Sequence, residues 1–504
     1  MDNIASKIKS EETDYKHVDR SDPIGKLYFF IQLFSFFPIF IIREILLISV
    51  FRKIFFNYLR KLFTKQLEKR HEFPHHIQLD KYYLILSILD MIEKSMFNTP
   101  NMHVKRKRLH LFINIFFKRL PIIKKYKKEH GEYPPGFLTI GIGKFCNLKC
   151  TGCYANGTDA ASEKLSWDMM NRIITEKKNL CGSFFTVITG GEPLVWRSQG
   201  KDLFDLAEKH SDQLFLFYTN ATLINEKTVK RMNELGNITP AISIEGYKTE
   251  TDGRRGEGVY DKIENAMNLL RDNNVGFGIS ITATKENAEM LSNSEIYDYY
   301  FQKMGASFGW LFQYMPIGRS HTIDLLVTPE QRMKLLRNIQ SLIKDKKYFM
   351  VDFWNSGTCV EGCISAGSQG GFLYIDWNGN ITPCAFNPYS AVNIYDIYKE
   401  GKNLNDVLQA PYFKAIREWQ NHYGVQRTKD EIGNWITPCL CKDHYNDLRP
   451  LIDKYKPVPI DEPAREALND NDYKKGMIKH GKDLAKVINP IWEKEYIEPE
   501  RKAS

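Results

Sequence analysis

The sequence lacks a hydrophobic run long enough to cross a bilayer cleanly. Its longest uncharged stretch near the N-terminus, "LYFFIQLFSFFPIFII" at residues 27–42, has 16 residues, whereas a spanning helix needs about 20. Pro38 would kink this stretch, and Arg43 and Glu44 follow it directly. These features argue against a simple transmembrane helix and favour a segment that lies at a membrane surface or half enters it.

Signals for secretion and for a disulfide framework are also missing. Residues 1–25 are polar and charged, without the early apolar core of a signal peptide. The nine cysteines in 504 residues are an odd count, and most of them gather in tight clusters. Such clusters are typical of thiolate ligands in a reducing compartment. We therefore expect a cytoplasmic protein at the periphery of a membrane.

Acidic residues are scarce in the first quarter of the chain. Residues 1–130 contain 25 Lys/Arg against 13 Asp/Glu, and the other 374 residues sum to −3 within the total of +9. The stretch "VKRKRLHLFINIFFKRLPIIKKYKK" (104–128) has ten Lys/Arg and no acid, and a second basic set follows the first apolar run: Arg52, Lys53, Arg60, Lys61 and Lys65. Basic flanks of this kind suit acidic lipid headgroups.

Three interpretations of this basic region stay open. Residues 26–130 could form a helical, membrane-surface region, their helices could simply pack on the main domain, or the region could bind nucleic acid. Long aliphatic runs between the basic blocks favour anionic lipid over nucleic acid, so we expect a membrane surface and no nucleic acid as partner.

The middle of the chain alternates β-rich and helical patterns. Six apolar runs read as strands, at residues 137–143, 184–189, 214–219, 240–245, 276–283 and 308–315. Six βα repeats imply a parallel sheet covered by helices, and right-handed crossovers curl it toward a barrel. We predict an α/β fold with a partial (β/α)6 TIM-like barrel over residues 135–327, whose chemistry lies at the carboxyl ends of the strands.

Three cysteines follow the first of these strands, in "FCNLKCTGCYA" (145–155). Zinc needs four nitrogen or sulfur ligands, and no fourth lies near Cys146, Cys150 and Cys153. A redox pair would need only two thiols. Three thiolates can hold three irons of a [4Fe–4S] cube and leave the fourth iron free to chelate a small molecule.

The spacing C-x3-C-x2-C after the first strand of a βα series resembles the radical S-adenosylmethionine (SAM) superfamily. The segment "TGGEPL" (189–194), after the second strand, is similar to the family's Gly-Gly-Glu-Pro segment. The resemblance covers roughly residues 137–320 and implies a [4Fe–4S] cluster that binds SAM. It also implies that Gly190 and Gly191 let the backbone approach SAM and that Glu192 accepts a hydrogen bond from the SAM amino group.

Later strand ends extend the resemblance. Thr219 opens "TNA", which is similar to the family's TNG turn with alanine in place of glycine, and Ser243 in "SIEG" resembles a ribose contact. Arg254 in "GRRGEG" resembles the arginine that pairs with the SAM carboxylate, with Arg255 as the alternative.

One position departs from the family pattern. Many members place an aromatic residue or a histidine before the third cysteine to pack on adenine, but Gly152 stands there. Tyr154 is then the candidate for the adenine-packing surface.

Five further cysteines lie near the C-terminus. The stretch "CISAGSQGGFLYIDWNGNITPC" reads as C-x15-G-x4-C, with Gly379 in a hairpin turn. This resembles the SPASM/twitch extension, which implies one auxiliary [4Fe–4S] cluster; a zinc ribbon is the alternative. The candidate ligands are Cys363, Cys384 and Cys441, then Cys439, with Cys359 as the alternative fourth because C-x-C spacing strains a shared cube.

The remaining segments complete the predicted organisation. Residues 1–25 form a polar tail, and residues 451–504 form a charged, proline-containing C-terminal tail or a segment that wraps the protein. Residues 328–350 are a linking helix with an N-cap at Thr328. The small SPASM/twitch-like iron–sulfur domain occupies 351–450.

The resemblance implies an oxidoreductase that reductively cleaves SAM, with an electron from a donor such as a flavodoxin or ferredoxin. The resulting 5′-deoxyadenosyl radical would abstract hydrogen from an unactivated carbon. Our lead hypothesis is a membrane-associated lipid substrate, because the N-terminal region is apolar and basic. A peptide- or protein-modifying maturase is the alternative. A non-catalytic iron–sulfur scaffold is a second alternative, although a scaffold has no need of the intact GGEP segment.

Overall fold

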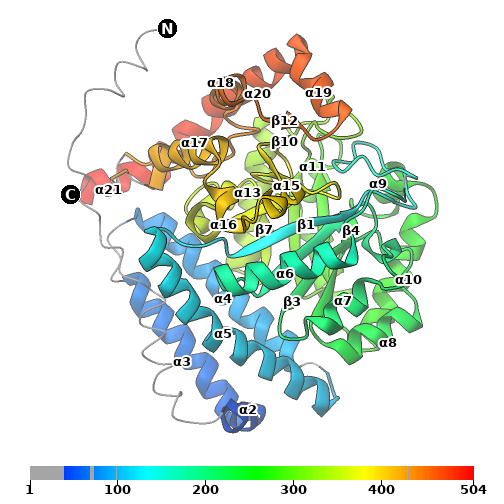
Figure 1. Cartoon of the computed structure of the whole chain (residues 1–504). Coiled ribbons are helices and arrows are strands. Elements are labelled where there is room, and N and C mark those ends of the chain that lie inside the picture. The colour runs from blue at the N-terminus through cyan, green and yellow to red at the C-terminus, as the bar shows by residue number, and fades with distance from the viewer. Residues whose placement is uncertain are drawn as a thin grey trace. The chain divides into compact units, whose positions relative to one another are not determined.

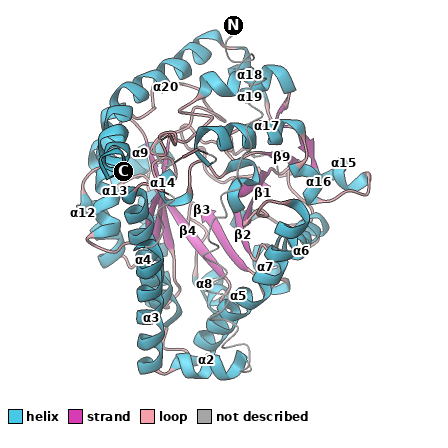
Figure 2. Cartoon of the chain, turned by 90° about the vertical axis from the view of Figure 1, so that its left-hand side faces the viewer, coloured by secondary structure: helices cyan, strands magenta, loops and turns pink. Residues whose placement is uncertain are grey.

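A ten-stranded sheet runs through the described part of the chain, in the order β11-β9-β8-β1-β2-β3-β4-β5-β6-β7. The computed structural model describes residues 39–68, 73–97, 99–159, 161–425, 427–428 and 431–503. The predicted polar tail 1–25 and most of the uncharged run 27–42 lie outside these residues. Figures 1 and 2 show strands at the centre with helices around them.

Six parallel strands form the predicted barrel series: β1 Phe137–Gly143, β2 Phe185–Gly190, β3 Leu214–Thr219, β4 Ile238–Ile244, β5 Gly278–Ala283 and β6 Phe308–Gln313. Their consecutive, parallel order confirms the α/β reading. These strands are almost continuously apolar because both faces are covered. Loops at their carboxyl ends therefore meet at one pole of the barrel.

Helices between the strands cover the outside of the sheet. They are α6 Trp167–Cys181, η2 Pro193–Val195, α7 Leu203–Lys209, α8 Glu226–Leu235, α9 Lys248–Arg255, α10 Val259–Asp272, α11 Ala288–Leu291, α12 Ser294–Asp298 and η3 Tyr299–Lys303. Ser166 caps α6, because its side chain accepts a hydrogen bond from the backbone N–H of Met169 at 3.2 Å.

The C-terminal region extends the sheet at both edges. The linking helix α13 Pro329–Lys344 has the predicted Thr328–Gln331 capping box and leads to β7 Met350–Asp352, parallel to β6. On the far side, β8 Phe372–Ile375 pairs parallel with β1, and β9 Asn380–Thr382 and β11 Val392–Asn393 follow antiparallel. Gly379 takes φ +82° in the turn between β8 and β9, as a glycine in a tight hairpin does.

Short elements surround this hairpin: α14 Gly357–Val360, η4 Ser365–Gly370, β10 Tyr389–Ser390, α15 Ile394–Lys399, α16 Leu404–Leu408, α17 Pro411–Gln420 and η5 Asn421–Val425. The chain continues through α18 Tyr445–Tyr455, β12 Val458–Pro459, α19 Glu462–Asn469, α20 Asn471–Trp492, η6 Glu493–Ile497 and α21 Glu498–Ala503.

Residues 451–503 form packed helices, which agrees with the wrapping segment and not with the charged tail that the sequence left as alternatives. Helix α20 buries Tyr473, Met477, Leu484, Ile488 and Trp492, which recur at helical spacing beneath its charged face. High charge content concealed this apolar stripe, because the lysines and acids occupy the solvent side of the same helix.

The N-terminal region is helical, as predicted: α2 Ile39–Leu47, α3 Ser49–Glu68, α4 His75–Phe97 and α5 Met102–His130. The basic stretch 104–128 lies within α5 and turns its apolar side chains inward; Val104, Leu109, Leu111, Leu120 and Ile123 are buried. For α5 the packing interpretation therefore holds. Among the described helices, none is both long and apolar enough to span a bilayer.

A buried ion pair joins the linking helix to the C-terminal region. Arg332 of α13 and Asp443 are 0% and 1% exposed, and two N–O contacts of 2.5 and 3.1 Å join them. Arg332 also donates to the Asn355 side chain at 2.8 Å and to the Ile436 carbonyl at 2.8 Å. One guanidinium thus connects three segments that are far apart in the sequence.

Replacing this arginine should destabilise the fold strongly. Arg332→Leu would leave the Asp443 carboxylate buried without its partner, and we expect a loss of about 3–5 kcal/mol in the free energy of unfolding, measured by urea denaturation. Arg337→Leu is the control on the same helix, because Arg337 is 45% exposed and contacts Glu495 and Gln340 at the surface; its cost should be about 0–1 kcal/mol. Equal losses for the two variants would contradict this account.

Candidate functional site

A cavity of about 370 Å³ opens at the carboxyl ends of the barrel strands. The three cysteines of the first loop lie in its wall, and so do the predicted contacts Gly190, Gly191, Thr219, Ser243 and Arg254. Ten aromatic side chains complete much of the lining: Phe137, Tyr154, Phe185, Tyr218, Trp310, Phe312, Tyr314, Phe353, Phe372 and Phe386. One cavity therefore combines a cluster of thiols with an apolar interior.

The cysteine loop is held directly against the GGEP segment by backbone hydrogen bonds. The Gly191 N–H donates to the Gly143 carbonyl at 2.8 Å, and the Glu192 N–H donates to the Phe145 carbonyl at 2.9 Å. A Cβ on Gly191 would lie 2.1 Å from the Phe145 oxygen, and one on Gly190 would lie 2.4 Å from the Gly143 oxygen. The two glycines are therefore needed for contact between two protein segments, besides any approach to SAM.

Glu192 lies beneath the cavity and is only 2% exposed. Its carboxylate accepts hydrogen bonds from the Thr219 hydroxyl (2.8 Å), the Asn220 N–H (2.8 Å) and the Leu194 N–H (3.1 Å). Burial raises the pKa of Glu192 to about 7. In this structure the carboxylate therefore fixes the turn after β3, and its predicted contact with the SAM amino group stays a prediction.

Both predicted arginines converge on Glu245, which is 1% exposed. Its Oε1 lies 2.5 Å from Arg254 Nη1 and 2.6 Å from Arg255 Nη2. Arg254 also donates from Nε to the Thr151 carbonyl at 3.0 Å, so it braces the loop between the second and third cysteines. Arg255 lines the same cavity, and its buried Nε–H has no hydrogen-bond partner among the described residues. The alternative residue, Arg255, is thus the one with a donor left for an anionic ligand.

The departure at Gly152 has a steric cause. Gly152 takes φ +62°, and a Cβ there would lie 2.7 Å from the ring of Tyr314, which follows β6. Tyr314 occupies the space that a side chain before the third cysteine would need. Tyr154 also lines the cavity, with its hydroxyl bonded to Thr189, so two tyrosines are available as a packing surface.

The segment after β6 supports the cysteine loop and was missed by the sequence reasoning. The Arg319 N–H donates to the Cys153 carbonyl at 3.0 Å, and its guanidinium bonds to the Gly157 carbonyl. A Cβ on Gly318 would lie 2.3 Å from the Tyr154 oxygen. Only the glycine in "MPIGR" hinted at this contact, because arginine and tyrosine carry no positional signal of their own.

A family comparison identifies this core. Residues 140–294 match the model of the radical SAM superfamily.

The core of this chain, residues 140–294, is therefore a radical SAM domain.

Curated relatives share this core to different extents. An uncharacterised protein of Methanocaldococcus jannaschii is 28% identical over 44% of this chain and 79% of its own length. The Fe-coproporphyrin III synthase of Methanosarcina barkeri is 30% identical over 28% of this chain and 35% of its own. The sporulation killing factor maturation protein SkfB of Bacillus subtilis is 26% identical over 32% and 39%. The chain thus spans little more than a third of the last two relatives.

Two solved structures are similar to this chain over about three fifths of its length. Streptococcus suis SuiB bound to its precursor peptide SuiA has a TM-score of 0.45 and 21% identity, over 60% of this chain and 71% of that one. A tagged anSMEcpe with bound AdoMet has a TM-score of 0.45 and 17% identity, over 64% and 99%.

The radical SAM enzymes use a [4Fe–4S] cluster and SAM as cofactors, and the loop residues fit that role. Burial raises the pKa of the Cys146 thiol to about 12, so the thiol needs a metal to become a thiolate. Within the described residues, no three His, Cys, Asp or Glu side chains converge as ligands of a single metal ion. Thiolates that bind different irons of a cube need not converge on one point.

Four of the five C-terminal cysteines gather in one place. The Cys441 thiol hydrogen-bonds with Cys384 and Cys439, and these contacts with burial raise its pKa. Burial also raises the pKa of Cys363, to about 11, and neighbouring Cys439 and Cys384 add to the effect. Cys359 instead lies toward Asp80 and Lys81 of α4. The structure thus brings together Cys363, Cys384, Cys439 and Cys441 and sets Cys359 apart.

The C-terminal cysteines adjoin the radical SAM cavity. Phe386, two residues after Cys384, lines that cavity, and its ring lies 5.8 Å from the ring of Tyr154. Lys442, between Cys441 and Asp443, donates at 3.0 Å to Gln313, which also lines the cavity. The two groups of cysteines therefore share one structural neighbourhood.

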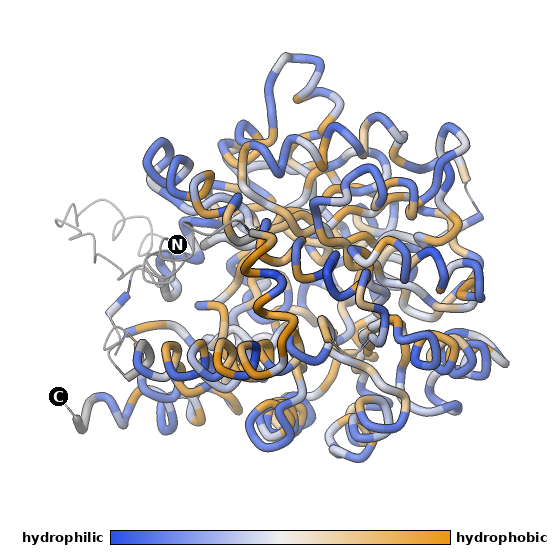
Figure 3. Tube along the Cα trace, turned by 90° about the horizontal axis from the view of Figure 1, so that it is seen from below, coloured by the Kyte–Doolittle hydropathy of each residue, from blue (hydrophilic) through white to orange (hydrophobic). Residues whose placement is uncertain are grey.

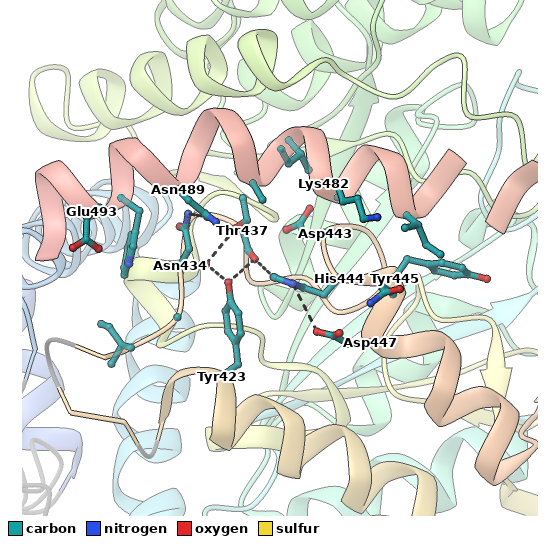
Figure 4. Close-up of a pocket in the computed structure, with 18 of the residues that line it drawn as sticks. Tyr423, Asn434, Thr437, Asp443, His444, Tyr445, Asp447, Lys482, Asn489 and Glu493 are labelled. Carbon is teal, nitrogen blue, oxygen red and sulfur yellow. Dashed lines mark hydrogen bonds and ion pairs between the residues drawn. The ribbon is translucent and has the colours of Figure 1, made fainter. Parts of the chain in front are cut away.

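A second cavity, of about 690 Å³, lies between the segment 431–447 and α20 (Figure 4). His444 Nε2 lies 2.8 Å from the Thr437 carbonyl, and the Tyr423 hydroxyl donates to the Asn434 carbonyl at 3.1 Å. The Asn434 side chain donates to Asn489 of α20 at 3.0 Å. These bonds fix the loop that carries Cys439 and Cys441.

Adding one methyl group at Gly191 should disable the radical SAM site. Gly191→Ala would drive a Cβ into the Phe145 carbonyl and displace the cysteine loop, and we expect about a hundredfold slower formation of 5′-deoxyadenosine, because shifts of about 1 Å have that effect. Gly253→Ala, where a Cβ meets nothing within 4 Å, is the control on α9. A full rate for Gly191→Ala, measured after anaerobic reconstitution, would contradict the packing role.

Iron content should separate the C-terminal cysteines. If the four gathered cysteines hold an auxiliary cluster, Cys384→Ala should lower iron per chain by about half after reconstitution, since one of two clusters is lost. Cys359→Ala should keep its iron. The zinc-ribbon alternative predicts zinc in the wild-type protein and unchanged iron in Cys384→Ala.

Proposed function

We propose that this radical SAM enzyme carries a second iron–sulfur cluster and modifies a side chain of a peptide or protein. One observation carries the proposal: a single cavity is lined by the three thiols, by the GGEP glycines and by Phe386 from the C-terminal cysteine region. Chemistry at the first cluster and residues next to the second would therefore act on the same bound group.

The residues of the cavity would have three tasks: to hold the cluster, to bind SAM and to exclude water. Cys146, Cys150 and Cys153 would hold three irons of the first cluster, and the free N–H of Arg255 would meet the carboxylate of SAM. When bound, the cluster and SAM supply a 5′-deoxyadenosyl radical that removes hydrogen from an unactivated carbon. The aromatic wall excludes water from this space, which protects a reactive species from side reactions. A low-potential flavodoxin or ferredoxin would supply the electron.

The size of the cavity favours a substrate that inserts only a small part of itself. About 370 Å³ is near the lower end of the range for sites that hold one small ligand, so SAM would take up most of it. The aromatic lining beside SAM then suits an apolar side chain of the substrate. The relative SkfB is named as a maturation protein for a sporulation killing factor, and this supports a peptide or protein substrate here.

A lipid remains the second candidate because one observation favours it. An acyl chain would also suit the aromatic cavity, and the N-terminal helices α2 and α3 expose an apolar, basic surface. The lead hypothesis from the sequence thus becomes the alternative, since a named maturation protein is among the relatives.

Comparative mass spectrometry should identify the substrate class. Cells that carry the active gene are compared with cells that carry the Cys153→Ala variant, which lacks one proposed iron ligand. The control is Cys181→Ala, which changes a buried cysteine outside both groups of cysteines. We expect a mass change in a peptide or protein that depends on Cys153 and not on Cys181. A Cys153-dependent change confined to lipids would overturn the peptide proposal in favour of the second candidate.

A further inference from the structure

Exposed apolar side chains concentrate on two N-terminal helices. Among the described residues, twelve large hydrophobic side chains are exposed, and seven of them lie between Phe40 and Tyr58. Val50 is 62% exposed, Ile54 59% and Phe51 50%. We call six of these residues the α2–α3 apolar face: Phe40, Ile45, Ile48, Val50, Phe51 and Ile54. In the view from below, hydrophobic stretches run along helices at this end of the molecule (Figure 3).

The face is not the inward stripe of an ordinary surface helix. The inward positions are already filled by other residues, because Ile42, Leu46, Phe56 and Leu59 are buried. A surface helix normally turns polar residues to the solvent, whereas the first half of α3 also exposes Val50, Phe51 and Ile54 there. Contiguous exposed apolar residues of this kind mark a surface that binds something.

Basic residues accompany the apolar face. Lys53, Lys61 and Lys65 are exposed along α3, and residues 39–130 contain 20 Lys/Arg against 7 Asp/Glu. Nearby acids are already matched: Glu44 pairs with Arg43 and Arg106, and Asp90 and Glu93 pair with Arg60. The surface thus presents an excess of positive charge beside an apolar patch.

We propose that the α2–α3 apolar face binds the surface of an anionic lipid bilayer. Phe51, Ile54 and their neighbours would enter the boundary between headgroups and acyl chains, as in helices that lie in the membrane plane. Lys53, Lys61 and Lys65 would contact anionic headgroups. This charge complementarity selects lipid over an apolar protein partner. Helix α5 contributes charge and no insertion, because beyond Met102 at its start its described apolar side chains are mostly buried or half-buried.

The inference is independent of the substrate, because binding can be measured without SAM or turnover. It would place the enzyme at the periphery of a membrane, where either a peptide or a lipid could be presented to the cavity. If the face does not bind lipid, the proposed reaction is unaffected.

Vesicle sedimentation tests the proposal with the full, anaerobically purified chain. We expect co-sedimentation with phosphatidylglycerol-containing vesicles and weaker binding to pure phosphatidylcholine. Val50→Ser with Ile54→Ser should weaken binding about tenfold or more, because two inserting side chains are lost. The matched control is Val360→Ser with Val458→Ser, two exposed apolar residues elsewhere, at 39% and 64% exposure. Lys53, Lys61 and Lys65 changed to Gln should remove the preference for the anionic lipid.

Three outcomes would overturn the proposal. The first is a negative sedimentation assay: either the wild-type protein does not sediment with anionic vesicles, or the test and control variants lose the same amount of vesicle binding. The second is a wild-type dimer that Val50→Ser with Ile54→Ser converts to a monomer without lipid binding, which would make the face a contact between copies of the chain. The third is vesicle binding that appears only after residues 1–38 are deleted, which would make that segment the occupant of the face.

Discussion

The contact between the cysteine loop and the GGEP segment is the constraint on which the site depends. The two backbones lie so close that a Cβ on either glycine would overlap a carbonyl oxygen of residues 143–145. Close approach lets the N–H groups of Gly191 and Glu192 bond to the loop, which satisfies donors that would otherwise be buried without partners. The loop that bears the three thiols is thus fixed by strands β1 and β2 together, and the cavity forms above this junction.

Charge around the loop follows from the same arrangement. Arg254 and Arg255 share one buried carboxylate, Glu245, so two cations face a single anion beside three thiols. An arginine pair with one counterion leaves positive charge for a ligand that is itself anionic, and a thiolate-bound cluster or a carboxylate meets that condition. Arg254 is committed to the loop through Thr151, whereas Arg255 keeps a free donor. The sequence could rank these two residues by motif position only, and their division of labour required the geometry.

The predictability of each part depended on how local its signal is. Strands of the barrel were found because apolar runs and turn residues are local, and the loop cysteines were found because three thiols within eight residues have few other uses. Tyr314, Arg319 and Arg332 were missed, since each acts through a partner that is distant in the sequence. The sequence could not decide between a C-terminal tail and a wrapping segment, because composition averages over the two faces of a helix. The stretch 104–128 looked membrane-active for the same reason, although its apolar face packs inward.

The position of the C-terminal cysteines limits what a second cluster could do. Strand β8 pairs with β1 along four residues. The hairpin before Cys384 therefore belongs to the same sheet as β1, the strand that leads into the first cysteine loop. Phe137 of β1 and Phe372 of β8 stack at 5.0 Å across this pair, and both line the cavity. Because the sheet is continuous, a hinge between the two regions would have to break parallel pairing in a buried strand, which carries a high cost. The C-terminal hairpin is therefore a fixed wall of the cavity, and a molecule that enters the cavity must pass elements other than this hairpin.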